Sequence, residues 1–234
     1  MDDGPDGLDD ALAGELRAAL DAVLAGGMAE DAVAHAGQVA GVMTVFDRAF
    51  RADGLRCVLV GGAAIEVHAP GVYMSHDIDL VIDALYLPDR RARVGRVFAQ
   101  LGFAQQGRHW ERGGLYVEVP GTFLEDPSEP YTSPPWQFTV VTKEVLLRDR
   151  LVGFKYWGQL TYALQAYEML RAFGSLLDMG WLTPQLRREN VQDVFGALQA
   201  YVTAGGTPTD EVLERLLAQV RGASHGDGVA DWDD

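Results

Sequence analysis

Residues 58–81 read VLVGGAAIEVHAPGVYMSHDIDLV, and this stretch decides the fold. The apolar run over residues 57–60 predicts a short buried strand that stops at Gly61-Gly62. A helix is expected over residues 63–68, directly behind the glycines, and a proline-glycine break follows it. Residues 77–82 predict the next strand, in which acidic and aliphatic residues alternate before the run becomes wholly apolar.

Asp77 and Asp79 lie two residues apart on this predicted strand. Because side chains alternate along a strand, both carboxylates face the same side, while Ile78 and Leu80 face the core. Two carboxylates on one face repel each other and lose hydration, and core packing gives no reason to place them there. A divalent cation removes this conflict, and Mg²⁺ commonly binds one or two carboxylates together with phosphate oxygens and water.

The glycine pair adds a second element to the predicted site. Glycine lets the backbone come close to a ligand, and the helix that follows presents free N–H groups to an anion. We expect a phosphate chain at Gly61-Gly62, with a metal ion bridging it to Asp77 and Asp79. Such an arrangement suits phosphoryl and nucleotidyl transfer, in which positioning and charge neutralisation supply most of the catalysis.

A third acid, Glu118, lies in a predicted hairpin over residues 107–120, whose two-residue turn is Gly113-Gly114. Apolar residues flank Glu118 on the second arm, so it is either an exposed residue of an edge strand or a third inward ligand. The aspartate pair upstream favours the ligand. A further alternative is an unrelated α/β protein in which both aspartates are exposed and far from Glu118.

The remaining patterns place helices around this unit. Before the unit, helical spacing covers residues 8–25 and 29–52, and within it a helix is expected from about Pro88 to Leu101. After a proline-containing loop at residues 121–136 and a strand at 138–141, helices are expected at 143–174, 184–203 and 208–221, two of them marked by Thr183-Pro184 and Thr207-Pro208. The fold class predicted is α+β: a small mixed sheet backed by helices, with a helical C-terminal half.

This organisation predicts five segments. They are a disordered acidic tail (1–7), N-terminal helices (8–53), an α/β core (54–142), a helical C-terminal region (143–221) and a second disordered acidic tail (222–234). The net charge of −15 is concentrated at the ends, since residues 1–32 hold nine acids and residues 205–234 hold seven, whereas the middle is nearly neutral. The ends are interpreted as solubilising or, alternatively, as acidic partner-binding segments.

Cysteine usage and hydropathy indicate a compartment. The single cysteine, Cys57, excludes an internal disulfide and a multi-cysteine zinc site, and its apolar surroundings predict a buried thiol. A basic signal-peptide region and an apolar run long enough to span a bilayer are both missing from the sequence. These features predict a cytoplasmic protein without a membrane partner.

The ordered motifs carry a family resemblance. Val60-Gly61-Gly62, a short helix, Asp77-Ile-Asp-Leu80 and the later strand acid Glu118 resemble the signature of the DNA polymerase beta-like nucleotidyltransferase superfamily. The approach to the acidic strand, Tyr73-Met-Ser75-His-Asp77, is similar to the small bacterial branch that includes minimal nucleotidyltransferases and AbiEii-type toxins. The resemblance covers about residues 55–175.

This resemblance implies a reaction and a set of site residues. The reaction is Mg²⁺- or Mn²⁺-dependent transfer of a nucleoside monophosphate from an NTP to a hydroxyl of a protein, an RNA or a small molecule, in a setting such as a toxin–antitoxin or defence system with a cognate protein partner. The implied metal and catalytic residues are Asp77, Asp79 and Glu118, and the implied nucleotide-binding residues are Gly61, Gly62, Ser75, Arg150 and Lys155. The last two are the candidates for a basic position on the helix after the catalytic unit.

Several alternatives stay open. Ser75 either binds the terminal phosphate or is a strand-start hydroxyl that bonds the backbone. The basic residue that often precedes the Asp-x-Asp motif is absent, and this favours a second hypothesis, a nucleotidyltransferase-like fold kept as a binding or regulatory module. Four arginines on one predicted helix form either a solvated face or a nucleic-acid contact: Arg90, Arg91, Arg93 and Arg96.

Overall fold

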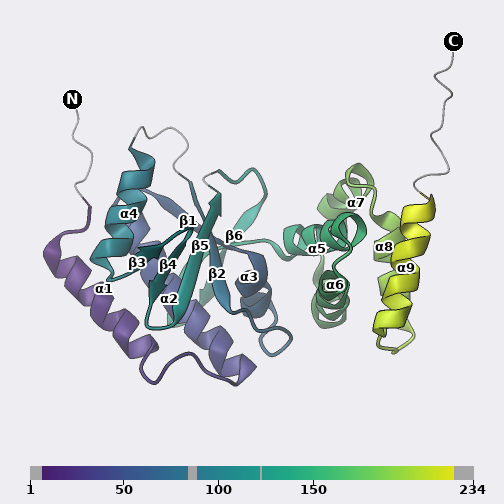
Figure 1. Cartoon of the computed structure of the whole chain (residues 1–234), viewed down its shortest axis with the longest axis horizontal. Helices are drawn as coiled ribbons and strands as arrows, with labels where there is room; N and C mark the ends of the chain where they lie inside the picture. The colour runs from purple at the N-terminus through teal and green to yellow at the C-terminus, as the bar shows by residue number, and fades with distance from the viewer. Residues whose placement is uncertain (1–6, 84–88, 122, 224–234) are drawn as a thin grey trace, which may run out of the picture. The chain divides into compact units, whose positions relative to one another are not determined.

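The computed structural model describes residues 7–83, 89–121 and 123–223 of the chain. Internal packing divides the chain into two compact units, residues 1–142 and residues 143–234. The first unit combines helices with a mixed β-sheet, and the second contains helices (Figure 1). The predicted α+β class with a helical C-terminal half is therefore confirmed.

A mixed sheet forms the centre of the first unit. Its described strands are β1 (Arg56–Val60), β2 (Asp77–Asp83), β3 (Ala104–Gln106), β4 (His109–Arg112), β5 (Leu115–Gly121), β6 (Ser128–Ser133) and β7 (Trp136–Val141), in the spatial order β3-β4-β5-β2-β1-β7-β6. The pairs β1–β7 and β2–β5 are parallel, and the other neighbouring strands are antiparallel. The predicted hairpin is confirmed as β4 and β5, joined at Gly113-Gly114.

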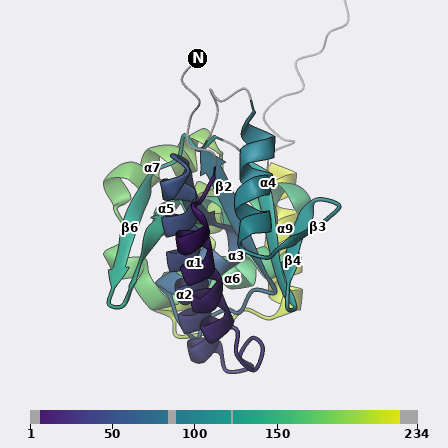
Figure 2. The same cartoon turned by 90° about the vertical axis from the view of Figure 1, so that its left-hand side faces the viewer.

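Four helices accompany the sheet: α1 (Asp10–Val23), α2 (Ala32–Ala52), α3 (Gly61–His68) and α4 (Arg90–Gln100). The first two begin at aspartate caps, because Asp9 accepts a hydrogen bond from the Leu12 N–H and Asp31 accepts from the N–H groups of Val33 and Ala34. Helix α2 packs against β1 and β7, and α1 lies along α2 (Figure 2). The long apolar side of α2 thus closes one face of the sheet.

An aromatic cluster fixes α4 against α2 and the outer strands. The Phe98 ring centroid lies 5.7 Å from that of Phe46 and 5.3 Å from that of Phe50, in edge-to-face geometry. On its other side, Phe98 stacks on Trp110 of β4, with centroids 4.8 Å apart and planes 16° apart. Such pairs add to the stabilisation that burial gives, so α4 and β4 hold a defined relative position.

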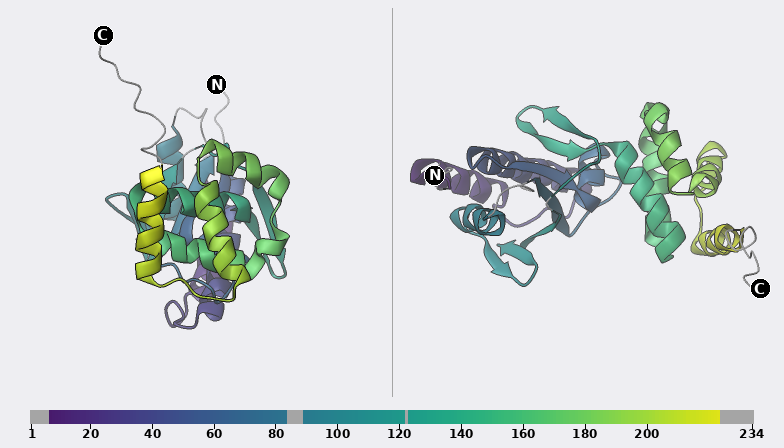
Figure 3. Two further views of the ribbon diagram at one scale, coloured as in Figure 1. Left: turned by 90° about the vertical axis from the view of Figure 1, so that its right-hand side faces the viewer. Right: turned by 90° about the horizontal axis from the view of Figure 1, so that it is seen from above.

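The second unit is built from α5 (Lys143–Val152), a π-helical turn (Gly153–Trp157), α6 (Leu160–Phe173), a 3₁₀ turn (Gly174–Leu176), α7 (Met179–Arg188), α8 (Gln192–Thr203) and α9 (Asp210–Ala223) (Figure 3). The single helical segment predicted over residues 143–174 is wrong in detail. Gly158 takes a left-handed conformation with φ of 74°, and its N–H donates to the Phe154 carbonyl, which ends the first helix.

Other elements also differ from the predictions, and the single helix predicted over residues 184–203 is divided into α7 and α8, with Asn190 in a left-handed conformation (φ of 52°) between them. Residues 121–136 are not wholly a loop, because β6 occupies Ser128–Ser133, and β3 was not anticipated. Helix α7 begins before the predicted Thr183-Pro184 start, since Asp178 accepts hydrogen bonds from the N–H groups of Gly180 and Trp181 and Pro184 lies inside the helix.

The chain ends lie mostly outside the described residues. This holds for residues 1–6 of the predicted tail 1–7 and for residues 224–234 of the predicted tail 222–234, and also for the predicted helix start at Pro88. Gly222 and Ala223, assigned by the sequence to the second tail, are instead the last residues of α9. Among the described helices, none combines the length and the apolar character needed to cross a membrane.

Candidate functional site

Three carboxylates converge on neighbouring strands at the centre of the sheet. Asp79 of β2 lies opposite Val60 of β1 on one side and opposite Glu118 of β5 on the other. Asp77 points to the same face two residues earlier, as strand alternation requires. Each of the acids Asp77, Asp79 and Glu118 is half-buried and offers an oxygen, and these oxygens all lie within 4.8 Å of one another. We call this group the acidic cluster.

The register excludes the edge-strand alternative for Glu118, and its role as a ligand stays a prediction. Strand β5 pairs with β4 and with β2, so Glu118 lies on an interior strand and not at an exposed edge. The alternative in which the aspartates lie far from Glu118 is likewise excluded by the distances within the acidic cluster. Carboxylate oxygens at this spacing suit a hard divalent cation, which would relieve the repulsion between three acids.

The glycine pair fits closely around the acidic cluster. Gly61 has φ of +68°, and a Cβ built on it would lie 2.1 Å from Asp79 Oδ2. A Cβ on Gly62 would lie 2.8 Å from Ser75 Oγ. Helix α3 begins at Gly61, so its first N–H groups and positive dipole end lie beside the Asp79 carboxylate. A side chain at either glycine would therefore displace a group of the site.

Ser75 connects the acidic cluster to the buried interior. Its hydroxyl donates to Asp77 Oδ1 at 3.3 Å, and its backbone N–H donates to Glu66 Oε2 at 3.1 Å. Glu66 belongs to α3 and is fully buried, and its Oε1 is hydrogen-bonded to His35 Nδ1 from α2. The buried chain His35–Glu66–Ser75 fixes the segment leading into β2. Sequence reasoning did not identify His35 or Glu66.

Two basic side chains flank the third carboxylate. Arg108 Nε lies 3.4 Å from Glu118 Oε1, and His109 Nδ1 lies 3.8 Å from Glu118 Oε2. His109 is directly opposite Glu118 in the β4–β5 register. Neither residue was singled out from the sequence, although the hairpin that was predicted from the glycine turn places both next to Glu118.

An open hollow adjoins the acidic cluster. It has a volume of about 540 Å³ and is lined by Tyr73, Ser75, His76, Asp77, His109 and Tyr116. Its lining combines the polar groups of Ser75 and Asp77 with the aromatic side chain of Tyr116, which is 46% exposed. Its volume lies within the range of small-molecule sites.

Arg150 and Lys155, the two basic candidates from the sequence, belong to the second unit. Lys155 lies in the π-helical turn, is 2% exposed, and donates to the Asn190 carbonyl and to Asp193 Oδ2, the latter at 3.0 Å. The Arg150 guanidinium lies 5.0 Å from the Tyr162 ring centroid. Its Nε is buried and has no hydrogen-bond partner among the described residues. A contribution of either residue to nucleotide binding stays a prediction.

Comparisons with known proteins gave one structural similarity. Neither a family model nor a curated protein matches the sequence. Among solved structures, the chain is similar to an antigenic nucleotidyltransferase-like protein from Paracoccidioides brasiliensis, with 16% sequence identity and a TM-score of 0.47. The similarity covers 74% of this chain and 95% of that protein.

Proposed function

We propose that the first unit is a metal-dependent nucleotidyltransferase centre that transfers a nucleoside monophosphate from an NTP to a hydroxyl group. One observation carries this proposal: the oxygens of Asp77, Asp79 and Glu118 lie within 4.8 Å of one another beside the first turn of α3. Carboxylates next to free N–H groups provide for a cation and a phosphate chain together. The motif resemblance in the sequence points to the same chemistry.

Each residue has a role in this proposal. The acidic cluster would hold Mg²⁺ or Mn²⁺, which when bound supplies charge neutralisation at the phosphates. The N–H groups at Gly61 and Gly62, together with the Ser75 hydroxyl, would hold the triphosphate. Glu118 would accept the proton of the acceptor hydroxyl while the oxygen of that hydroxyl bonds to the α-phosphorus of the NTP. The bond from that phosphorus to the bridging oxygen breaks, and pyrophosphate leaves.

A direct test measures binding by calorimetry with ATP, CTP, GTP and UTP, each with Mg²⁺, for the wild type and for Asp77→Asn. We expect at least one nucleotide to bind the wild type and to bind Asp77→Asn roughly tenfold or more weakly, because a ligand oxygen loses its charge. Excess EDTA should weaken wild-type binding in the same way. A labelled NTP with candidate acceptors then tests transfer and pyrophosphate release.

Asp83→Asn is a matched control, because Asp83 ends the same strand, outside the acidic cluster, and lies 3.9 Å from Arg56 in an ion pair. It should bind nucleotide as the wild type does. Lack of binding to all four nucleotides, or equal binding by wild type and Asp77→Asn, would contradict the proposal.

A second candidate is a nucleotidyltransferase-like fold that binds a partner without catalysis. The ion pair between Lys155 and Asp193 favours this second candidate. Lys155 is one of two residues that could supply the basic group for nucleotide binding, and the Asp193 carboxylate already neutralises its ammonium group. This candidate predicts that Asp77→Ala/Asp79→Ala folds normally and keeps both its partner and its biological effect. Loss of the effect in that variant, with folding intact, would exclude it.

The biological setting also belongs to the proposal. The acceptor would be a protein, RNA or small-molecule hydroxyl, and the setting a bacterial, cytoplasmic toxin–antitoxin or defence system with a cognate protein partner. The motif branch that the sequence resembles supports this setting. Co-purification of the tagged full-length chain with a neighbouring gene product, compared with the chain alone, tests the partner.

A further inference from the structure

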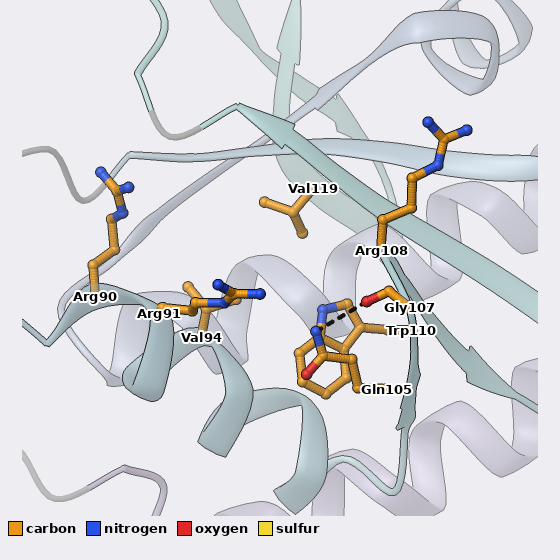
Figure 4. A pocket seen from close by; sticks show the side chains of 8 residues that line it. All are labelled: Arg90, Arg91, Val94, Gln105, Gly107, Arg108, Trp110 and Val119. Carbon is orange, nitrogen blue, oxygen red and sulfur yellow. Dashed lines mark hydrogen bonds between the residues drawn. The ribbon is translucent and has the colours of Figure 1, made fainter.

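A second hollow of about 340 Å³ lies where α4 faces the outer strands (Figure 4). Its lining residues, which we call the arginine pocket, are Arg90, Arg91, Val94, Gln105, Gly107, Arg108, Trp110 and Val119. Arg90 and Arg91 extend from α4, with Arg91 pointing towards Trp110, and Arg108 lies across the hollow with its guanidinium turned away from Trp110 (Figure 4). The pocket is distinct from the hollow beside Asp77 and Ser75, since the two have no lining residue in common.

The charge of the arginine pocket has one sign. Three arginines line it, of which Arg108 also pairs with Glu118, and no carboxylate lines it among the described residues. Arg90 and Arg91 are the first two residues of α4, where the positive end of the helix dipole makes a cation unfavourable. Neither has an ion-pair partner in the described part of the chain, although the protein carries a net charge of −15. A bound anion would remove this unfavourable concentration of positive charge.

The floor of the pocket is apolar and rigid. Trp110 stacks on Phe98 with a centroid distance of 4.8 Å, and a Cβ on Gly95 would lie 3.5 Å from the Trp110 ring. Val94 is 8% exposed and packs at the base of the same hollow. Packed side chains therefore form the base of the pocket, and its volume of about 340 Å³ suits a group the size of one nucleotide or a smaller phosphate ester.

Arg108 links the arginine pocket to the acidic cluster. It lines the pocket, and its Nε also lies 3.4 Å from Glu118 Oε1. Val119, the next residue along β5, lines the pocket too. Strand alternation places Val119 and Glu118 on opposite faces of β5, so Arg108, at the turn before β4, is the residue that connects the pocket to the carboxylate proposed to accept the proton of the acceptor.

We propose that the arginine pocket binds a phosphate ester group of the acceptor substrate. Guanidinium groups recognise phosphate through charge-assisted, often bidentate hydrogen bonds, and the Trp110 floor contacts the carbon part of the ligand. That the ligand is the acceptor substrate rests on the proposed function, whereas binding of a phosphate group in this pocket does not. Two sources share this chemistry: the 3′-terminal segment of an RNA and a small phosphorylated alcohol.

The experiment measures binding to the full-length chain in EDTA without any NTP, so that the acidic cluster holds no metal. One arm uses fluorescence anisotropy with a tetraribonucleotide that has a free 3′-hydroxyl and a 5′ fluorophore. The other arm uses calorimetry with glycerol 3-phosphate. We expect one of the two probes to bind. Arg91→Ala should weaken that binding roughly tenfold, and the affinity of the variant should fall less steeply with salt concentration than that of the wild type.

Arg96→Ala is the matched control, because Arg96 is exposed on the same helix, carries the same charge and does not line the pocket. It should bind as the wild type does. Arg91→Ala should stay folded, because alanine has a high helix propensity and the substitution removes a positive charge from the positive end of the α4 dipole. Failure of both probes to bind, or equal weakening by the two substitutions, would overturn the proposal.

Asp77→Asn separates this proposal from the proposed function. The variant should still bind the phosphate probe even if it loses Mg²⁺-dependent nucleotide binding.

Discussion

At Gly61 the backbone takes φ of +68°, and the Asp79 carboxylate occupies the place where a side chain would be. Both constraints select glycine, the first through backbone conformation and the second through space. Replacement by alanine would add about 1 kcal/mol of backbone strain and would also push Asp79 away from the acidic cluster. The two effects can be separated by experiment.

We expect Gly61→Ala to fold with reduced stability and to lose Mg²⁺-dependent nucleotide binding, measured by calorimetry and by urea unfolding. Gly113→Ala is the control, since Gly113 has φ of +59° and a Cβ there would meet no described atom within 4 Å. It should show a similar strain cost of about 1 kcal/mol and bind normally. Normal nucleotide binding by Gly61→Ala would show that the Asp79 position is unimportant.

The sequence was sufficient to predict the residues of the acidic cluster but not those around it. Asp77 and Asp79 are recognisable from strand alternation alone, and Glu118 from a hairpin with a clear turn. His35 and Glu66 carry no such pattern, because their hydrogen bond joins two helices across 31 residues of sequence. The arginine pocket was not predicted either, since α4, the β3–β4 turn and β5 meet only in the folded sheet.

At the scale of elements, the buried chain of hydrogen bonds from His35 through Glu66 to Ser75 joins α2, α3 and the start of β2. Glu66 is fully buried, and without its carboxylate the Ser75 N–H and the His35 ring nitrogen would be left unpaired there. Each unsatisfied buried polar group costs roughly 1–3 kcal/mol. The chain therefore stabilises the unit and positions the segment next to the acidic cluster.

We expect Glu66→Leu to lower the free energy of unfolding by about 3 kcal/mol, measured by urea denaturation, and Glu66→Gln to cost less because an acceptor oxygen remains. Glu15→Leu is the control, since Glu15 forms an exposed ion pair with Arg48 at 3.0 Å and should cost less than about 1 kcal/mol. Equal effects of Glu66→Leu and Glu15→Leu would argue against a structural role for the buried chain.

Prolines explain why the sequence did not predict strand β6 and the start of helix α7 correctly. Strand β6 contains Pro130, which cannot donate to a strand ladder, and the sequence therefore predicts a loop. In the described structure β6 pairs with β7 alone, at the edge of the sheet, where a missing donor is tolerated. Pro184 also misled the prediction for α7, because Asp178 caps the helix and its first residue, Met179, lies five residues before the expected start at Pro184. The edge position in the sheet explains the first case, and a local aspartate cap explains the second.

At the scale of the whole molecule, the two units differ in how they relate to the proposed site. The acidic cluster, the glycine pair and the arginine pocket all belong to residues 1–142, whereas Arg150 and Lys155 belong to residues 143–234. The first unit also has its own core, with Phe46, Phe50 and Phe98 fully buried. It should therefore fold without the second unit.

We expect residues 1–142, produced alone, to unfold cooperatively and to keep Cys57 unreactive towards a thiol reagent. Cys57 is 2% exposed, and burial, aided by the charge of Asp47, raises the pKa of its thiol well above the ordinary value, so the thiolate is scarce at neutral pH. The measurement compares the labelling rate with that of the full chain. Rapid labelling without denaturant would contradict independent folding.

The parallel pairing of β2 with β5 has a consequence for folding kinetics. Asp79 and Glu118 become neighbours only when this pairing closes a long segment of chain, whereas the β4–β5 hairpin forms locally. A refolding chain would consequently form the proposed cation site late, with the central strands and not with the hairpin. The unfolded chain holds no such group of oxygens, so Mg²⁺ would bind the native state alone. The melting temperature of the protein would then rise with Mg²⁺ concentration, and unfolding would become slower.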